Sequence, residues 1–253
     1  MKILRAHLPT AICLLLLAWS GPASATTDVA PTCKSTLYLT FDTGNMRHAE
    51  LIASTLSKYG AKATFFLAQE KTLRGDQALD ASWAAYWQAR VAEGHAFGSH
   101  TWHHGSFRSD LPGGRVRYRL MEGTTEILDA PALCQELTGS DSRFFELTGR
   151  KLDRIWRAPG GRTTPNTLAA AQACGYRHTG WAAAGFLGDE LPSESYPNAV
   201  LLQRALKQLK NGDIVMAHLG IWSRQDPFAP MLDPLLAGLK AKGFCFATLA
   251  TQP

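Results

Sequence analysis

Residues 36–44 read Thr-Leu-Tyr-Leu-Thr-Phe-Asp-Thr-Gly, an alternating run that ends in a carboxylate and a glycine. Such alternation predicts a β-strand over Leu37–Asp42, and the glycine predicts an immediate change of chain direction. We therefore expect Asp42 at the carboxyl end of a buried strand. In α/β folds these strand ends carry the chemistry, which makes Asp42 the first candidate functional residue.

Short apolar runs alternate with longer amphipathic runs along the chain, a pattern typical of a parallel sheet covered by helices. Seven or eight such alternations favour one closed or nearly closed α/β barrel. An irregular segment around Pro112-Gly113-Gly114 interrupts the pattern before a helical periodicity resumes. The predicted strands are 37–42, 63–67, 96–100, 155–157, 176–181, 214–217 and 244–249, and the predicted helices are 47–59, 82–93, 116–136, 164–173, 199–210 and 234–242.

The first residues have the pattern of a secretory signal peptide. Lys2 and Arg5 precede an apolar run at 11–19, and a small-residue Ala-Ser-Ala site follows. We expect residues 1–25 to be the signal and 26–253 to be one exported domain, periplasmic or secreted. No run reaches the roughly 20 apolar residues of a transmembrane helix, so no membrane segment is expected after cleavage. An uncleaved, anchored form is the alternative.

The charge of the chain argues against one class of partner. Without Lys2 and Arg5, 24 basic and 21 acidic residues remain, a net charge of +3. The basic residues are scattered and form no run with interleaved aromatic residues, so the pattern of a nucleic-acid-binding protein is missing. We expect no nucleic-acid partner, whereas acidic polymers of the cell envelope stay open as partners.

Four cysteines follow the signal, and an oxidising compartment would pair them into disulfides. Cys33 precedes the first predicted strand and Cys245 lies in the last, so a closed barrel favours a bridge between them. The other two cysteines are Cys134 and Cys174. No Cys-x-x-Cys spacing exists, which argues against a zinc–thiolate site.

Four further side chains near predicted strand ends would meet Asp42 at one rim of the sheet. His100 and His104 are four residues apart, a spacing that lets two imidazoles face one metal ion. Arg157 and His218 end later strands. Each residue alone has a plain alternative: a helix cap for Asp42, and a surface or hydrogen-bonding role for the others. An amide hydrolase needs a base, a stabiliser for the oxyanion and an acid, and the set together supplies them.

Aromatic residues divide into two groups by their spacing. Trp83, Tyr86 and Trp87 recur at helical intervals and are predicted to face the core. Trp102 lies between the two candidate metal ligands, and Trp222 follows His218 closely. These two are the better candidates for a wall that contacts substrate.

The motifs together resemble those of the NodB-type polysaccharide deacetylases, carbohydrate esterase family 4, from about Leu37 to Leu249. The family's Thr-Phe-Asp-Asp-Gly, His-Ser/Thr-x-x-His and Arg-x-Pro-Tyr-Gly motifs are followed by a Trp and Asp signal and a final histidine motif. The matching residues are Thr40-Phe41-Asp42-Thr43-Gly44, His100-Thr101-Trp102-His103-His104, Arg157-Ala158-Pro159-Gly160-Gly161, Trp181 and Asp189, and Met216-Ala217-His218-Leu219.

The resemblance implies a fold, a cofactor and a role for each matching residue. The fold would be a distorted (β/α) barrel of about seven parallel strands, the NodB homology domain. The cofactor would be a divalent metal ion, zinc first, with cobalt, nickel or manganese as alternatives. The resemblance implies that Asp42 is the general base and that Arg157 pairs with it, while His100 and His104 ligate the metal. It also implies that His218 is the general acid, that Asp189 orients His218, and that Trp181 and Leu219 line the acyl pocket.

Position 43 departs from the family pattern, because Thr43 stands where the family has an aspartate that ligates the metal. Three explanations are open. Asp42 completes a site with His100 and His104, which we prefer because two histidines and one carboxylate suffice for an open catalytic site. Alternatively, water fills the position and metal affinity falls, or ordinary deacetylase activity is lost.

Two further departures reshape the pocket. Gly160 replaces a tyrosine, which lets the backbone approach a ligand closely, although a plain turn explains it equally well. Leu219 replaces an aspartate. A branch of the family that deformylates a lipid-linked amino sugar tolerates such variants. The expected function is therefore metal-dependent removal of an N-acetyl or other acyl group from an envelope or extracellular carbohydrate, with that deformylase or a non-catalytic glycan-binding protein as alternatives.

Overall fold

The computed structural model describes residues 33–251. The predicted signal peptide at 1–25 lies outside this range. Among the described residues, no helix combines the length and the apolar character that crossing a bilayer requires.

Seven strands form one sheet in which every pairing is parallel. Its order is β10-β1-β2-β3-β7-β8, and β9 pairs with β1 as well. The sheet curls into a half-barrel, as predicted. The strands are β1 (Ser35–Asp42), β2 (Ala63–Leu67), β3 (Ala96–Ser99), β7 (Ile155–Trp156), β8 (Arg177–His178), β9 (Ile214–His218) and β10 (Phe244–Phe246).

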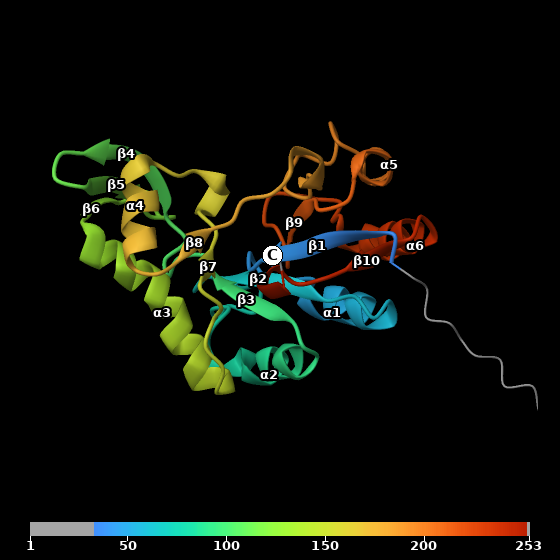
Figure 1. Ribbon diagram of the computed structural model, residues 1–253, viewed down its shortest axis with the longest axis horizontal. Coiled ribbons are helices and arrows are strands. Elements are labelled where there is room, and N and C mark those ends of the chain that lie inside the picture. The colour runs from blue at the N-terminus through green and yellow to red at the C-terminus, as the bar shows by residue number, and fades with distance from the viewer. Residues whose placement is uncertain (1–32, 252–253) are drawn as a thin grey trace, which may run out of the picture. The chain divides into compact units, whose positions relative to one another are not determined.

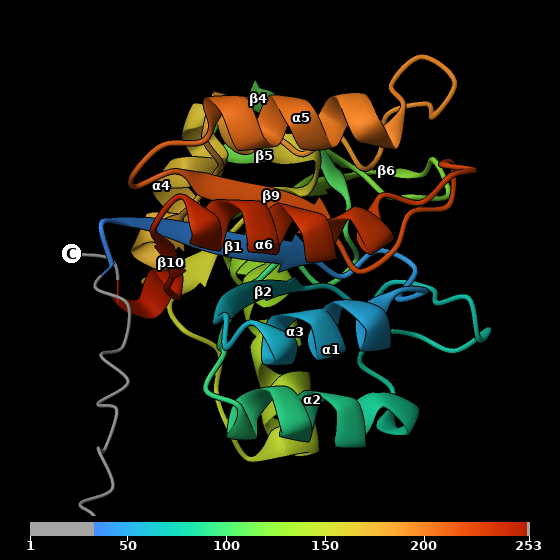
Figure 2. The same ribbon diagram turned by 90° about the vertical axis from the view of Figure 1, so that its right-hand side faces the viewer.

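Six helices accompany the strands, and several cover the outer face of the sheet. Figure 2 shows α5, α6, α1 and α2 following one another across that face, while α3 and α4 lie at the other end of the molecule in Figure 1. The helices are α1 (Ala49–Lys58), α2 (Ala84–Ala92), α3 (Ala130–Thr148), α4 (Pro165–Ala173), α5 (Asn198–Gln208) and α6 (Leu232–Ala241).

Alternation along β1 decides which side chains face the helices. Leu37, Leu39 and Phe41 are buried in the main core between sheet and helices. Because neighbouring side chains of a strand point to opposite faces, Tyr38 and Asp42 face the inside of the half-barrel. Tyr38 packs there against a small separate core. The carboxylate of Asp42 therefore lies inside, at the carboxyl end of the central strand.

Aromatic side chains fill the space between the sheet and α2, as the helical spacing predicted. Trp83, Tyr86 and Trp87 are buried, with exposed fractions of 2%, 7% and 0%. The Trp87 ring packs edge-on against Phe65 and Phe97 of neighbouring strands. None of these rings is left to contact a substrate.

The predicted helix at 116–136 is wrong over its first half. Residues 106–128 form a separate three-stranded antiparallel sheet of β4 (Ser106–Leu111), β5 (Arg115–Arg119) and β6 (Thr125–Leu128). Val116 and Tyr118 are buried while their neighbours are exposed, which is the two-residue period of a strand. The helix α3 starts only after Asp129, whose side chain accepts a hydrogen bond from Ala132 N and caps it.

Two disulfides join distant segments of the described chain. Cys33 bonds Cys245, as predicted from the barrel, and ties the start of β1 to β10. Cys134 bonds Cys174 and links α3 to the end of α4.

Tyr118 connects the small sheet to the turn that follows β3. Its hydroxyl accepts a hydrogen bond from Gly105 N (2.7 Å) and donates one to Glu136 Oε2 (2.9 Å). We expect Tyr118→Phe to lower the free energy of unfolding by about 1–3 kcal/mol, because a buried amide and a carboxylate oxygen each lose a partner. Urea denaturation would measure it, and an unchanged midpoint would contradict it.

Candidate active site

Asp42 and Arg157 form a buried ion pair at the inner rim of the half-barrel. Arg157 Nη1 donates to Asp42 Oδ1 at 2.8 Å, and the exposed fractions of the two residues are 0% and 3%. Arg157 also donates to the carbonyl oxygens of Thr179 and Gly180. These contacts hold the guanidinium in one place, and it in turn holds one oxygen of the carboxylate.

The surroundings keep Asp42 ionised. Burial by itself raises the pKa of its carboxyl group, but the positive charges of Arg157 and His218 outweigh burial, so the pKa is held below its ordinary value. Asp42 is therefore a carboxylate at neutral pH, with Oδ2 not used by Arg157.

His100 follows β3 and presents a free nitrogen to the cavity. Its Nδ1 lies 2.9 Å from the Arg157 carbonyl oxygen, which can only accept, so Nδ1 carries the proton and Nε2 keeps its lone pair. Burial lowers the pKa of His100 to about 4, which keeps the ring neutral. Nε2 lies 3.4 Å from Asp42 Oδ2, so its lone pair faces the cavity beside that carboxylate.

His104 reaches the same place by a turn rather than along a helix. Thr101 and His104 have φ angles of 65° and 53°, a left-handed conformation that costs a residue other than glycine of order 1 kcal/mol and tends to occur at functional sites. The turn places the His100 and His104 rings 4.8 Å apart between centroids. His104 Nδ1 lies 3.3 Å from Met121 Sδ.

Thr43 does not face the cavity as a ligand but binds another carboxylate. Its hydroxyl donates to Glu70 Oε2 at 2.5 Å, and Gly44 N donates to the same oxygen at 2.9 Å. Glu70 Oε1 lies 3.7 Å from His104 Nδ1. We did not predict Glu70 from the sequence, although it comes three residues after β2, at the strand edge that carries the other candidates.

His218 and Asp42 are paired in the register of β9 and β1, so their side chains lie on the same face. Asp189 accepts a hydrogen bond from His218 N (2.7 Å) and lies 3.1 Å from His218 Nδ1. Burial opposes a charge on His218, but Asp189 outweighs it and raises the pKa of His218 to about 9. His218 is therefore an imidazolium at neutral pH that can give up a proton.

These groups line one cavity of about 320 Å³. Trp181 and Gly160, which we predicted as substrate contacts, also line it, and the space where a Gly160 side chain would stand is open. Leu219 does not: it is fully buried in the main core, with its side chain on the helix side of the sheet. The cavity residues are Asp42, Gly44, Glu70, His100, His104, Met121, Gly160, Trp181, Glu190, Met216, His218, Gly220, Ile221, Trp222 and Ser223.

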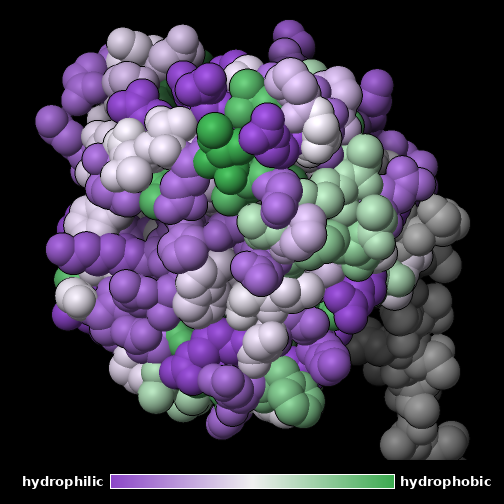
Figure 3. Space-filling view, turned by 90° about the vertical axis from the view of Figure 1, so that its left-hand side faces the viewer, coloured by the Kyte–Doolittle hydropathy of each residue, from purple (hydrophilic) through white to green (hydrophobic). Residues whose placement is uncertain are grey.

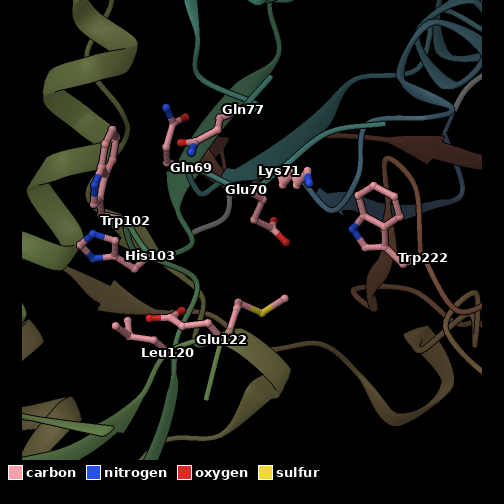
Figure 4. Close-up of a pocket in the computed structure, with 10 residues that line it drawn as sticks. Gln69, Glu70, Lys71, Gln77, Trp102, His103, Leu120, Glu122 and Trp222 are labelled. Atoms are coloured by element: carbon pink, nitrogen blue, oxygen red, sulfur yellow. The ribbon is translucent and has the colours of Figure 1, made fainter. Parts of the chain in front are cut away.

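A wider groove of about 550 Å³ adjoins the cavity and shares Glu70, Met121 and Trp222 with it. Trp102, which we predicted as a substrate contact, lines this groove rather than the cavity. Figure 4 shows Trp102 and Trp222 on opposite sides of the groove with Glu70 between them. The face of the molecule that carries the small sheet is mainly hydrophilic, with only separate apolar patches (Figure 3).

The donors in the cavity suit a divalent ion in their chemistry. Two imidazoles, one with a lone pair facing the cavity, and carboxylates within reach are the ligands that zinc and related ions take. Within residues 33–251, however, no three His, Cys, Asp or Glu side chains already stand close enough to form a finished metal site. The metal assignment of His100, His104 and Asp42 stays a prediction.

Comparison with known proteins agrees with the motifs. A family model described as polysaccharide deacetylase matches residues 30–179. A search of curated protein sequences finds no match.

Several solved structures share the fold at low identity. A peptidoglycan N-acetylglucosamine deacetylase matches with a TM-score of 0.66 and 20% identity over 85% of this chain and 86% of its own. An acetyl xylan esterase from Clostridium thermocellum, solved with cobalt, matches at 0.65 and 20% over 85% and 88%. A family 4 pseudoenzyme from Bacillus anthracis matches at 0.63 and 19%, over 86% of this chain but 64% of its own. At these identities the likeness establishes the fold alone.

Proposed function

We propose, from the premise that this chain belongs to the polysaccharide deacetylase family, that it is a metal-dependent hydrolase that removes an N-acyl group from a carbohydrate. The observation that carries the proposal is a carboxylate and an imidazole that face one cavity, Asp42 fixed by Arg157 and His218 fixed by Asp189. A buried carboxylate is kept ionised at Asp42, and an imidazole in register with it is kept protonated at His218. Two groups held in opposite states are what general base and general acid require.

The residues of the chain divide the reaction between them. Asp42, fixed through Arg157, takes a proton from the attacking water. His218, oriented by Asp189, gives a proton to the departing nitrogen, so that an amine and a carboxylate are released. A divalent ion, when bound, would supply the Lewis acid that polarises the acyl carbonyl. Trp181 forms a wall of the cavity beside Arg157, with 5.5 Å between the guanidinium carbon and the ring.

The adjoining groove supports a carbohydrate substrate longer than one sugar. It offers indole rings from Trp102 and Trp222 and the side-chain amide of Gln77. Sugars bind by stacking apolar faces on aromatic rings while polar side chains take their hydroxyls. We infer that the groove holds sugar residues flanking the one that loses its acyl group. Two disulfides in the described chain support an exported protein.

A release assay tests the proposal. Acetate and formate would be measured after incubation of the metal-loaded protein with chitin oligomers, peptidoglycan, poly-N-acetylglucosamine, acetylated xylan and lipid-linked amino sugars. Acetate from an N-acetylated glycan supports the proposal, and formate alone supports a deformylase. Because Thr43 departs from the family motif, a glycan-binding protein without activity is the second candidate. Binding of these glycans with no release from any of them would favour it.

The pH dependence of the reaction follows from His218. The histidine acts as an acid only while protonated, so we expect kcat/KM to fall above about pH 9. Asp189→Asn removes the charge that raises this pKa, so burial dominates and the fall should begin at lower pH. A pH series of acyl release on both proteins measures the shift. If the two profiles fall together, His218 is not the acid that Asp189 controls.

A further inference from the structure

Glu70 provides the carboxylate that position 43 lacks. Thr43 occupies the place after Asp42 with a neutral hydroxyl, and that hydroxyl donates to Glu70 Oε2. The Gly44 amide donates to the same oxygen. Two donors on one oxygen fix the carboxylate and leave Oε1 without either of them, on the side of His104 at 3.7 Å.

Asp42 and Glu70 differ in the negative charge that each still offers to an ion. Asp42 already has a guanidinium at 2.8 Å, and a cation bound to the same carboxylate would be repelled by it. The hydrogen-bond partners of Glu70 Oε2 are neutral, so the full negative charge of Glu70 remains for an ion. Since Arg157 is itself buried and held by two carbonyl oxygens, it cannot move away from Asp42.

We propose that Glu70 is the third metal ligand, with His100 and His104, and that Thr43 acts as the hydrogen-bond donor that orients it. Outer-shell donors of this kind fix the orientation of ligating carboxylates. The arrangement leaves Asp42 free as a base, which resolves the conflict of asking one carboxylate to serve as both ligand and base. The inference rests on the proposed function, because it concerns the ion which that function uses.

Metal binding, measured apart from activity, tests the inference. Purified protein would be stripped, and Zn²⁺ affinity measured by titration calorimetry, with the visible absorption of the Co²⁺ form as a report on its ligands. We expect Glu70→Ala to weaken Zn²⁺ by at least about 100-fold, beyond the 10–100-fold typical of outer-shell changes. Glu70→Gln keeps the size of the side chain and an oxygen that can accept the hydrogen bond from Thr43, so the local structure should be retained. It should also weaken Zn²⁺ binding, which would show that the lost affinity comes from the missing carboxylate and not from misfolding.

Three matched variants complete the comparison. Thr43→Val removes only the hydroxyl and should weaken Zn²⁺ by about 10–100-fold. Glu190→Gln removes another carboxylate that lines the cavity and should change the affinity by less than about threefold, as a screened charge does. Asp42→Asn removes a charge near the ion but no ligand, so it should weaken Zn²⁺ by less than Glu70→Ala does. Thr43→Asp combined with Glu70→Ala moves the carboxylate back to the family position and should restore binding.

The outcomes separate this inference from the proposed function. Normal Zn²⁺ affinity in Glu70→Ala, or its loss in Asp42→Asn instead, overturns Glu70 as the ligand while leaving the hydrolase proposal intact. Less than about a tenth of an equivalent in the wild-type protein overturns it too, because a true three-ligand site fills. If Zn²⁺ affinity falls in the Glu70 variants but the wild-type protein releases no acyl group from any substrate, Glu70 is supported as a metal ligand and the hydrolase function is rejected.

Discussion

Replacing His218 with glutamine is expected to lower kcat/KM for acyl release by about 10²–10⁴-fold, the range that general acids contribute. Glutamine keeps much of the size and a polar tip, but it cannot give a proton to a leaving nitrogen. Asp189 would remain hydrogen-bonded to the backbone amide of residue 218, so the cavity should keep its shape. The assay is acetate release from the best glycan of the substrate series.

Two measurements distinguish a lost acid from a damaged protein. Zn²⁺ affinity and the thermal midpoint should stay close to those of the wild type, because the metal ligands belong to other strands. His178→Gln is the matched control: this histidine ends β8 and is absent from the lining of the cavity, so its variant should keep its activity. If His218→Gln retains at least about a tenth of the wild-type rate, less than general acids contribute, His218 does not protonate the leaving group.

Replacing Arg157 with methionine should lower the free energy of unfolding by about 3–5 kcal/mol, because it leaves the carboxylate of Asp42 buried without its counter-charge. The sign of the pH effect follows from Asp42. Its pKa is depressed in the native wild type, so the ion pair stabilises the protein above the ordinary carboxyl pKa and loses this contribution as pH falls through the lower native value. In the variant the largest opposing positive charge is gone, so burial raises the native pKa of Asp42 and the deficit should shrink in acid.

Chemical denaturation of four proteins would measure the coupling: wild type, Arg157→Met, Asp42→Leu, and the two combined. The double variant buries no charge and should recover most of the loss, since an apolar replacement of a buried pair is often close to neutral. If Arg157→Met unfolds at the same free energy as the wild type, the ion pair is not the source of the stability. The same holds if the double variant is no more stable than Arg157→Met.

The parallel sheet could be predicted from the sequence because each of its strands shows an apolar pattern within its own residues. Strand β1 alternates cleanly, and its flanking glycine marks where it ends. The helix predicted from residue 116 was wrong over 116–128 because Arg and Leu are good helix formers and the strand alternation there is short. The three strands pair with one another in consecutive hairpins, and the hydrogen bond from Tyr118 to Glu136 of α3 is a contact that no local pattern reveals. The Asp129-Ala130-Pro131 start of α3 is a cap that would have placed the helix correctly.

The site residues that could be predicted are those that belong to a sequence motif and stand at the end of a strand. Asp42, Arg157 and His218 belong to that class, and the structure brings them together with His100. Leu219 was misplaced because the alternation of β9 sends residue 219 to the face opposite His218. Glu70 was missed because its meaning depends on Thr43, 27 residues earlier, and neither residue suggests the other until β1 and β2 are seen side by side.

The bridge from Cys33 to Cys245 has a practical consequence for handling the molecule. Both cysteines lie where β1 begins, whereas Asp42 and the cavity lie at the other end of this eight-residue strand, roughly 23 Å from its first residue at the rise of an extended strand. Figure 2 shows the start of β1 and β10 together on that remote side. A solid support attached on that side would leave the mouth of the cavity open to large polymers.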